Sequence, residues 1–568
     1  MRFFCFFILS FVACVLSYAQ NNEWLNHFGG FNPDNIQLMK LNRSKKLMAV
    51  GAFADSIRFK TGTYDSTFFV SNGGSLIMQF NPSDGSIYWI KQIGKGGTLW
   101  PNAMSIDKQN NTIIVGAYSL KPIVDPNSSS QTLDSVSSPG VFILKLDSMG
   151  NFNWAKSYKD NFYAVDIEVD DNSNVYFSGE YYNTVDFDPG PGVKNRISFN
   201  SPDGYLCSLD SNGDFRFVKV FPGGGFTSCD GLSYDRKGNI LILGSFQSNL
   251  LAKPNQRRIN GKGGTDIFLT RMDTSGISSW TRHIGGQYGE YGVAIEIDNS
   301  GSIFISGNYK DSTDMDPTIG KFYLRGNGNA TPNFWDVFIA KYNPQGKLLW
   351  SKGFGGKGSE RVYEMEMDSK SNIYVSGIFT DTADFDPSPN SNTFIPKGFD
   401  DLFISKFDSI GNYYFTMQYA GIGTVVINSL LVDQYDDIIC AGWFTDSIDF
   451  DPGLAKLYKT TKSFGSDMFI QKLNQNSIAV GLESNPMENF PKMLSFPNPT
   501  KGKFYIRIDE EFNTAFIKIR DLQGQLVSQA EFFSTNQLNL NIEGEKGLYI
   551  IELVIDNQAP AYLKVIKH

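Results

Sequence analysis

Hydrophobic and polar positions alternate in short runs along most of the chain, and the same succession of runs returns about every 65 residues. One landmark is an apolar strand followed by an acidic turn and a second strand, whose closing aromatic residue stands at positions 24, 89, 154, 217, 280, 350 and 415. Another landmark is an apolar strand that ends in glycine, at positions 51, 116, 179, 244, 307, 377 and 442. Since both landmarks keep one period, the pattern predicts seven copies of a single unit.

Each unit contains two predicted hairpins. A strand that ends near Asp368 turns into residues 373–375, and residues 403–406 turn through 408–411 into the strand that holds Phe415. Four short antiparallel strands in each of seven repeats predict an all-β fold, a seven-bladed β-propeller over residues 20–474.

The two ends of the repeat array fit each other. The seventh unit stops after Asn474 without its aromatic strand, whereas residues 24–30 (WLNHFGG) match residues 280–286 (WTRHIGG). We therefore expect the N-terminal strand to complete the last blade and to close the ring.

The first 19 residues have the features of a signal peptide. Arg2 precedes an apolar stretch at 3–16, and a small-x-small site ends at Ala19. Lipidation at Cys14 is the alternative, and both interpretations predict export from the cytoplasm. Because no second long apolar run follows, no transmembrane anchor is expected.

The period ends after residue 474, and two further segments follow. Residues 475–493 are rich in Asn, Ser, Glu and Pro and are predicted to be a linker. Residues 494–568 show short alternating strands, which predict a small immunoglobulin-like β-sandwich.

Composition narrows the class of ligand. The 50 Lys and Arg are outnumbered by 59 Asp and Glu, for a net charge of −9, and no basic cluster exists, so nucleic-acid binding is disfavoured. Without the signal peptide three scattered cysteines remain, Cys207, Cys229 and Cys440. They are expected to be small core side chains, although one disulfide between two of them stays open.

Paired carboxylates are the most distinct candidates for a site. They stand seven and nine positions after the repeat glycine, before a proline: Asp186 and Asp188, Asp314 and Asp316, Asp384 and Asp386, Asp449 and Asp451. Residues two apart on an extended segment point to the same side, so each pair is a possible calcium site. The proline persists in six units and the acid pair in only four, which favours a structural turn over calcium binding.

Other recurring residues are expected to serve packing. The basic residue of the F-I-x-K frame is predicted to form ion pairs within the propeller, at Lys145, Arg271, Lys341, Lys406 and Lys472. The periodic tryptophans are predicted to pack blades: Trp24, Trp89, Trp154, Trp280 and Trp350. Trp100, Trp335 and Trp443 break the period and are predicted to make surface or rim contacts.

No enzyme signature is found in the sequence. The chain has three histidines, and it lacks H-E-x-x-H, G-x-S-x-G, a Cys–His pairing and a phosphate-binding loop. We therefore assign no catalytic residue and no cofactor site, and expect a protein that is not an enzyme. A carboxylate pair brought together by the fold would escape such a search.

Two resemblances emerge from these motifs. The frame "D-x-F-I-x-K-x-D-x-x-G-x-x-x-W" followed by "G-N-I-Y-V-S-G" resembles bacterial SBBP-type propeller repeats and covers residues 22–475. The tail is similar to the C-terminal sorting domain of the type IX secretion system of Bacteroidetes, through P-N-P-T-x-G (497–502), D-L-Q-G-Q-L-V (521–527) and G-L-Y-I (547–550). The second resemblance implies that residues 494–568 engage the type IX machinery and direct the protein across the outer membrane.

These features lead to one main hypothesis and two alternatives. The main hypothesis is a secreted or surface-displayed, non-catalytic propeller that binds an extracellular polysaccharide or protein. The first alternative is a secreted polysaccharide hydrolase or lyase that uses carboxylates on the propeller face. The second alternative is a structural protein of the envelope.

Overall fold

Every regular element in the described part of the chain is a β-strand, so the all-β expectation is confirmed. The computed structural model describes residues 19–567 except 71–73, 160, 199–200, 253–256, 327–333, 454–455, 462–464, 480–492, 497–499, 509–512, 522–525, 534–536, 544–545 and 557–560. The predicted signal peptide up to residue 18, with Cys14, and most of the predicted linker therefore lie outside the described residues. None of the described residues forms a helix with the length and apolarity that crossing a membrane requires.

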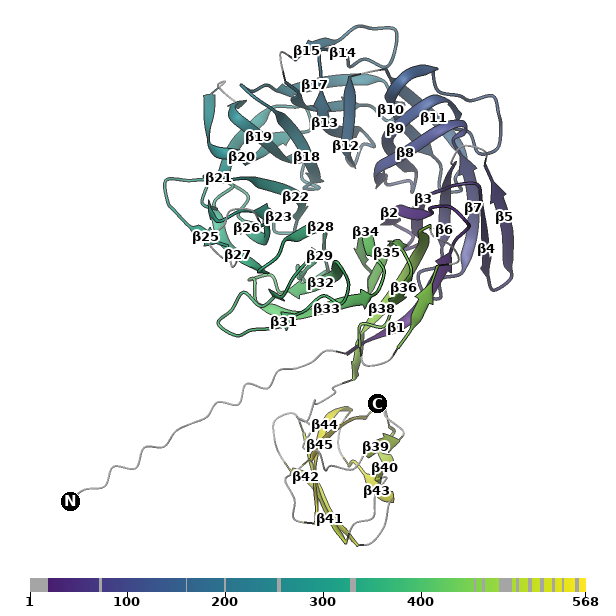
Figure 1. The fold of residues 1–568 in the computed structure, drawn as a ribbon, viewed down its shortest axis with the longest axis vertical. Helices are drawn as coiled ribbons and strands as arrows, with labels where there is room; N and C mark the ends of the chain where they lie inside the picture. The colour runs from purple at the N-terminus through teal and green to yellow at the C-terminus, as the bar shows by residue number, and fades with distance from the viewer. Residues whose placement is uncertain are drawn as a thin grey trace, which may run out of the picture. The chain divides into compact units, whose positions relative to one another are not determined.

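The chain divides into two units, and the larger one, residues 20–477, holds seven antiparallel sheets with four main strands each, three of which an outer hairpin extends to six strands (Figure 1). We number these sheets in chain order and give their strands from the centre outward. Sheet 1 contains β2 (Asn35–Leu41), β3 (Leu47–Phe53), β6 (Gly74–Phe80) and β7 (Ile87–Ile93). Sheet 2 contains β8 (Lys95–Ile106), β9 (Thr112–Ile123), β10 (Val136–Leu146) and β11 (Phe152–Tyr158). Sheet 3 contains β12 (Phe162–Val169), β13 (Val175–Tyr181), β16 (Asp203–Leu209) and β17 (Phe215–Phe221).

The remaining sheets repeat the same order. Sheet 4 contains β18 (Thr227–Tyr234), β19 (Asn239–Ala252), β20 (Arg257–Asp273) and β21 (Ser278–Gly286). Sheet 5 contains β22 (Glu290–Ile297), β23 (Ile303–Tyr309), β26 (Asp336–Tyr342) and β27 (Leu348–Gly356). Sheet 6 contains β28 (Glu360–Met367), β29 (Ile373–Phe379), β32 (Asp401–Phe407) and β33 (Tyr413–Gly421).

Sheet 7 joins the two ends of this unit. It contains β34 (Val425–Val432), β35 (Ile438–Phe444), β38 (Asp467–Ala479) and, as its outermost strand, β1 (Ala19–Phe28). The N-terminal strand thus occupies the position that the sequence match with residues 280–286 predicted. Strand β38 continues to Ala479 and so extends into the predicted linker.

Five of the sheets have a short outer hairpin between their second and third main strands in the chain. These hairpins are β4 (Ser56–Thr61) with β5 (Tyr64–Phe69), β14 (Thr184–Asp186) with β15 (Asn195–Ile197), β24 (Ser312–Asp314) with β25 (Tyr323–Arg325), β30 (Ala383–Asp384) with β31 (Thr393–Phe394), and β36 (Ser447–Asp449) with β37 (Tyr458–Thr460). The last three also pair with the outermost strand of the preceding sheet, as where Gly286 opposes Thr313. A Cβ on Gly286 would come within 2.3 Å of the Ser312 carbonyl oxygen, so glycine allows this approach. The Gly-Gly pairs at 285–286 and 355–356 thus end strands β21 and β27.

Four of the five periodic tryptophans join one sheet to the next by a hydrogen bond, whereas the buried Trp89 Nε1 has no hydrogen-bond partner among the described residues. Trp154 Nε1 of sheet 2 donates a hydrogen bond of 3.0 Å to the Ser211 carbonyl in a turn of sheet 3. The same contact recurs from Trp280 to Pro344, from Trp350 to Ser409 and, between sheets 7 and 1, from Trp24 to Pro82. Their role in packing is thus supported by a hydrogen bond in addition to apolar contact.

The basic residues of the repeat frame form the predicted ion pairs within the sheets. Lys145 Nζ lies 3.0 Å from Asp107 Oδ2, and Arg271 Nη2 lies 2.9 Å from Asp235 Oδ2. Cys207, Cys229 and Cys440 are buried free thiols, which agrees with their predicted role as core side chains.

The smaller unit covers residues 478–568 and contains two sheets around one core. One sheet contains β39 (Met493–Phe496), β40 (Lys503–Ile508) and β43 (Gln537–Asn541), and the other contains β42 (Leu526–Phe533), β41 (Thr514–Arg520), β44 (Gly547–Ile555) and β45 (Ala561–Lys567). Ile506 and Leu538 of the first sheet pack in the same core as Ile517 and Leu553 of the second. The immunoglobulin-like topology stays a prediction.

Candidate functional site

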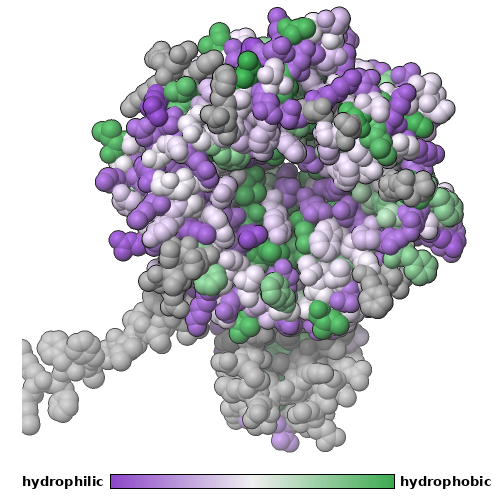
Figure 2. Space-filling model, turned by 45° about the horizontal axis from the view of Figure 1, so that its top comes forward, coloured by the Kyte–Doolittle hydropathy of each residue, from purple (hydrophilic) through white to green (hydrophobic). Residues whose placement is uncertain are grey.

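The first strands of the seven sheets surround a polar channel, which we call the central channel. Figure 1 shows β2, β8, β12, β18, β22, β28 and β34 around the opening, and Figure 2 shows the surface hollowed there. The channel holds two cavities, of about 610 and 250 Å³, which share Lys40, Glu168, Glu296 and Glu366. Turns after the first strands, such as Asp298 to Asn299, line only the larger cavity, so it lies at the end where these turns gather.

A β-bulge in every first strand shapes this channel. The register of each strand with its neighbour shifts at one equivalent residue: Gln37, Asn102, Val165, Asp230, Val293, Tyr363 and Asn428. A bulge leaves one residue unpaired and reorients the side chains that follow. Because it recurs at one position in all seven strands, the residues after it form common layers around the channel.

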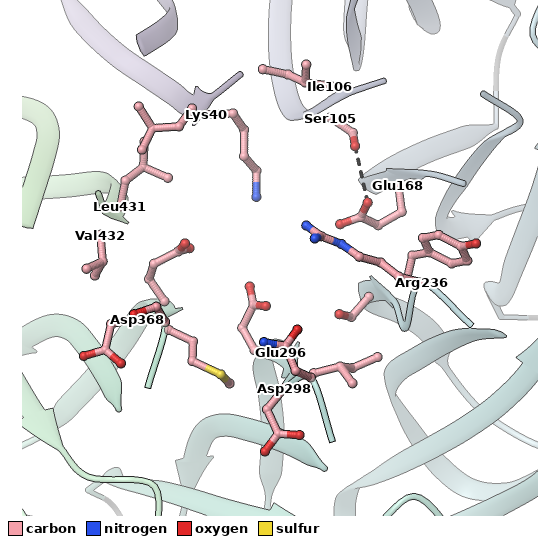
Figure 3. Close-up of a pocket in the computed structure, with 18 of the residues that line it drawn as sticks. Lys40, Ser105, Ile106, Glu168, Arg236, Glu296, Asp298, Asp368, Leu431 and Val432 are labelled. Carbon is pink, nitrogen blue, oxygen red and sulfur yellow. Dashed lines mark hydrogen bonds between the residues drawn. The ribbon is translucent and has the colours of Figure 1, made fainter. Parts of the chain in front are cut away.

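One of these layers contains the charged centre of the channel. It consists of the third residue after each bulge: Lys40, Ser105, Glu168, Ser233, Glu296, Glu366 and Leu431. Figure 3 shows Lys40 pointing from β2 toward the middle, with Glu168 and Glu296 pointing inward from other strands. One ammonium group therefore faces three glutamates from three different sheets.

A second layer adds carboxyl groups with different surroundings. Asp166, the first residue after its bulge, accepts hydrogen bonds from the backbone N–H of Ile167 at 2.8 Å and of Leu232 in the next sheet at 2.7 Å. This acid therefore also joins sheet 3 to sheet 4. Glu364, the equivalent residue of β28, has no hydrogen-bond partner among the described residues and borders the smaller cavity.

The electrostatics of the channel favour protonated carboxyl groups around a charged lysine. Burial would lower the pKa of Lys40, but Glu366, Glu168 and Glu296 outweigh burial and raise it above its ordinary value. Burial raises the pKa of Glu364 to about 8, although Lys40 acts in the opposite direction. The pKa values of Glu296 and Glu366 are also raised, chiefly by burial.

Lys40 forms no direct ion pair in the described part of the channel. Among the described residues, no carboxylate oxygen lies within 4.0 Å of Lys40 Nζ. Glu168 accepts a hydrogen bond of 3.3 Å from Ser105 Oγ, whereas Glu296 and Glu366 have no hydrogen-bond partner among the described residues. The ammonium and the carboxyl groups thus border open space, which a ligand with hydroxyl or amino groups would fit.

The predicted calcium ligands lie elsewhere, in the outer hairpins and their loops. The first acid of each pair closes its loop, as where Asp384 Oδ1 accepts from Asp386 N at 3.1 Å and from Asn392 N at 2.9 Å. Asp186, Asp314 and Asp449 make the same two contacts in their own hairpins.

The second acid of each pair forms an Asx turn. Oδ1 of this acid accepts from the backbone N–H two residues on, as in Asp188, Asp316, Asp386 and Asp451. The residue between the two acids is buried, at Phe187, Met315, Phe385 and Phe450. The described residues contain no group of three or more His, Cys, Asp or Glu arranged to hold a metal. The hydrogen bonds support the turn interpretation, and calcium binding at these pairs stays a prediction.

Sequence reasoning missed Lys40 and the channel glutamates, although a signal was present. Each residue of the charged layer stands eleven positions before the glycine landmark of its repeat, from 40 before 51 to 431 before 442. The position on each side of it is apolar or aromatic in every repeat, as Met39 and Leu41 are beside Lys40. Charged residues between such neighbours would have indicated a polar interior.

The tail matches one known family. Residues 495–568 match the family model described as "Secretion system C-terminal sorting domain". This match agrees with the resemblance seen in the sequence, and it implies export through the type IX system to the cell surface or beyond.

The repeat unit has distant relatives among known proteins. The chain is 21% identical over 430 residues to an uncharacterized WD repeat-containing protein of Acanthamoeba polyphaga mimivirus, covering 64% of this chain and 31% of that protein. It is 25% identical over 178 residues to the regulatory protein FlaEY of Caulobacter vibrioides, covering 30% of this chain and 17% of that protein. The chain thus spans less than a third of the length of these relatives. A solved structure of a Bacteroides caccae protein of unknown function aligns at 9% identity and a TM-score of 0.29, covering 64% of this chain and 94% of that one.

Proposed function

We propose that the larger unit is a closed seven-bladed β-propeller of the SBBP type that binds an extracellular ligand in its central channel without catalysis. Two observations support closure. Strand β1 pairs with β38 in sheet 7, and Trp24 of sheet 7 donates a hydrogen bond to the Pro82 carbonyl of sheet 1. The WD repeats named in the mimivirus relative are also propeller-forming repeats. The match of the tail to a secretion sorting domain supports a ligand that is met outside the cell.

The observation that carries the proposal is the charged layer of the channel. Seven equivalent positions with apolar or aromatic neighbours hold one lysine, three glutamates, two serines and one leucine. A purely structural ring has no need for such differences between its repeats. Polar groups that converge in a cavity without saturating one another are typical of a ligand site.

The electrostatics of the channel argue against catalysis by Lys40. Its raised pKa keeps the amine protonated near neutral pH, so it offers no lone pair for nucleophilic attack. The described residues that line the two cavities include no Cys or His to form a nucleophile–base pair.

A binding experiment tests this proposal. The purified full chain is incubated with immobilised cellulose, chitin, mannan, polygalacturonate and polylysine, and the retained fraction is measured for the wild type and for Lys40→Met and Glu296→Gln. We expect at least one matrix to retain the wild type, and about tenfold less retention of the channel variants. If both variants are retained as strongly as the wild type, the channel is excluded as the binding site.

The carboxyl groups of the channel favour one second candidate function. Glycoside hydrolases use one protonated and one ionised carboxyl group, and the raised pKa of Glu364, about 8, would keep a proton available at neutral pH. Soluble reducing sugar measured in the same incubations decides between the two functions. Its release by the wild type and its loss in Glu364→Gln would replace the binding proposal with a hydrolase.

A further inference from the structure

The end of the channel opposite the turns carries exposed aromatic side chains. Trp100 of β8, Tyr163 of β12 and Tyr291 of β22 are 41%, 52% and 40% exposed. They occupy one register position, since each pairs with the residue that follows the glycine landmark: Ala117, Glu180 and Asn308. We call these three residues the aromatic rim. They precede the bulge of each first strand, so the rim lies at the mouth near the smaller cavity.

Other aromatic residues support two members of the rim. The Tyr163 ring is edge-on to Tyr182 at 6.0 Å, and the Tyr291 ring lies 5.4 Å from Trp335. Lys310 Nζ sits 4.4 Å from the centre of the Trp335 ring, so one face of that tryptophan is already covered. Trp335 therefore supports Tyr291, and the exposed faces belong to the rim itself.

The position of the rim indicates a ligand. Single exposed aromatic residues are common on protein surfaces and need no explanation. Here they recur at one register position in three sheets, beside a channel with amide and carboxyl groups. Of the tryptophans that break the repeat, Trp100 is a member of the rim, Trp335 supports Tyr291, and Trp443 pairs with the same register position in sheet 7.

We propose that the aromatic rim is a platform for a neutral glycan chain, one end of which enters the central channel. This inference rests on the proposed binding function and names its ligand class. Aromatic faces pack against the apolar C–H faces of pyranose rings, and sugar hydroxyl groups both donate and accept hydrogen bonds. Hydroxyl groups would thus fit between the Lys40 ammonium, which only donates, and the channel carboxyl groups, which accept hydrogen bonds whether or not they carry a proton.

Charge argues for a neutral glycan rather than an acidic one. Asp166, Glu168, Glu296, Glu364 and Glu366 outnumber Lys40 in the channel. A polymer of uronic acids would bring its carboxylates beside these carboxyl groups, at an energetic cost for each group that is ionised or becomes ionised.

The test uses the full chain and soluble fragments of cellulose, chitin and mannan, with polygalacturonate and polylysine as charged probes. Trp100→Ala and Tyr163→Ala should each weaken binding of a neutral glycan about tenfold. Trp100→Phe should restore most of the affinity. Tyr458→Ala is the matched control, because Tyr458 is 58% exposed but lies on the outer hairpin strand β37. Thermal melting confirms that each variant is folded.

The outcomes separate this inference from the proposed function. Glycan binding that falls in Lys40→Met but not in the rim variants would overturn the rim and retain the channel. Binding of polylysine alone, dependent on Lys40 or Glu296, would overturn the glycan and likewise retain the channel. Binding of none of the probes would contradict both.

Discussion

His27 Nε2 lies 2.6 Å from Asp467 Oδ2, although 440 residues separate the two in the chain. The same contact occurs in sheet 4, where His283 Nε2 lies 2.8 Å from Asp266 Oδ2. In sheet 4 the two residues belong to the consecutive strands β20 and β21, whereas in sheet 7 they belong to β38 and β1. The first strand of the chain therefore reproduces in the last sheet a contact that a later repeat makes locally.

The first prediction concerns this contact between the ends of the repeat array. His27→Ala removes a partner from Asp467, whose side chain is only 2% exposed, and should lower the free energy of unfolding by about 1–3 kcal/mol. Denaturant melting of the full chain measures the loss. His283→Ala is the control, and the equivalent geometry predicts a loss of similar size. A His27 variant as stable as the wild type would contradict a stabilising role for the contact between His27 and Asp467.

Comparison of the repeats was sufficient to predict how these strands are arranged. The match of His27 with His283 placed β1 in sheet 7, and the periodic glycines placed the second strand of each sheet. The hydrogen bonds of Trp154 and Trp280 to the next sheet were not predicted, because they depend on the turn that each ring meets. Sequence reasoning expected only packing there.

The channel was harder to predict because its residues are distant in sequence. Lys40 and Glu366 belong to different repeats, and only the arrangement of the sheets around the central channel brings them to one cavity. The acid pairs were chosen as candidates because they recur in four repeats. They recur because Asp384 and its equivalents accept the hydrogen bonds that close the outer hairpins. Residues that differ among repeats were the better indication of a site.

The second prediction separates the apolar and polar parts of a tryptophan contact. Trp154→Phe retains a ring but removes the hydrogen bond to Ser211, and should cost about 1 kcal/mol. Trp154→Ala also removes the packed ring and should cost about 3–5 kcal/mol. Urea unfolding of both variants gives the two values. Equal losses would show that the hydrogen bond, rather than packing, accounts for the contact.

The third prediction concerns the outer acid pairs. Asp384→Ala removes the acceptor of two backbone N–H groups and should lower stability by about 1–2 kcal/mol. If Asp384 acts only through these hydrogen bonds, the substitution should cost the same stability in the presence of a chelator and in the presence of added calcium. Melting temperatures measured under both conditions test this. Stabilisation of the wild type by calcium that is absent in Asp384→Ala would instead establish the predicted metal site.

The fourth prediction concerns export. Deletion of residues 494–568 removes the sorting domain but leaves the strands of the larger unit intact. In a host with a type IX system, the shortened protein should accumulate in the periplasm, while the full chain reaches the surface or the medium. Cell fractionation and immunoblotting measure the distribution. Export of the shortened protein in unchanged amount would contradict the assigned role of the tail.

The fifth prediction concerns pH. Burial raises the pKa of Glu364 from 4.5 to about 8, so between these values the unfolded chain has released a proton that the folded chain retains. Stability therefore falls as pH rises through this window. Glu364→Gln removes this dependence and should melt on the order of 2 °C above the wild type at pH 8.5, with no difference at pH 4.

A carboxylate with the opposite shift provides the control for this fifth prediction. Burial would raise the pKa of Asp449, but hydrogen bonds from Lys456 Nζ at 2.8 Å and Leu457 N at 2.9 Å outweigh it and lower the pKa. Its ionised form stabilises the fold above the unfolded pKa of about 3.8, and this contribution is lost as pH falls through the folded value. Asp449→Asn should therefore melt below the wild type at pH 8.5, whereas Glu364→Gln melts above it. If the melting temperatures of both variants shift in the same direction, burial does not control the protonation of Glu364. The conclusion that this carboxyl group is uncharged in the channel would then be wrong.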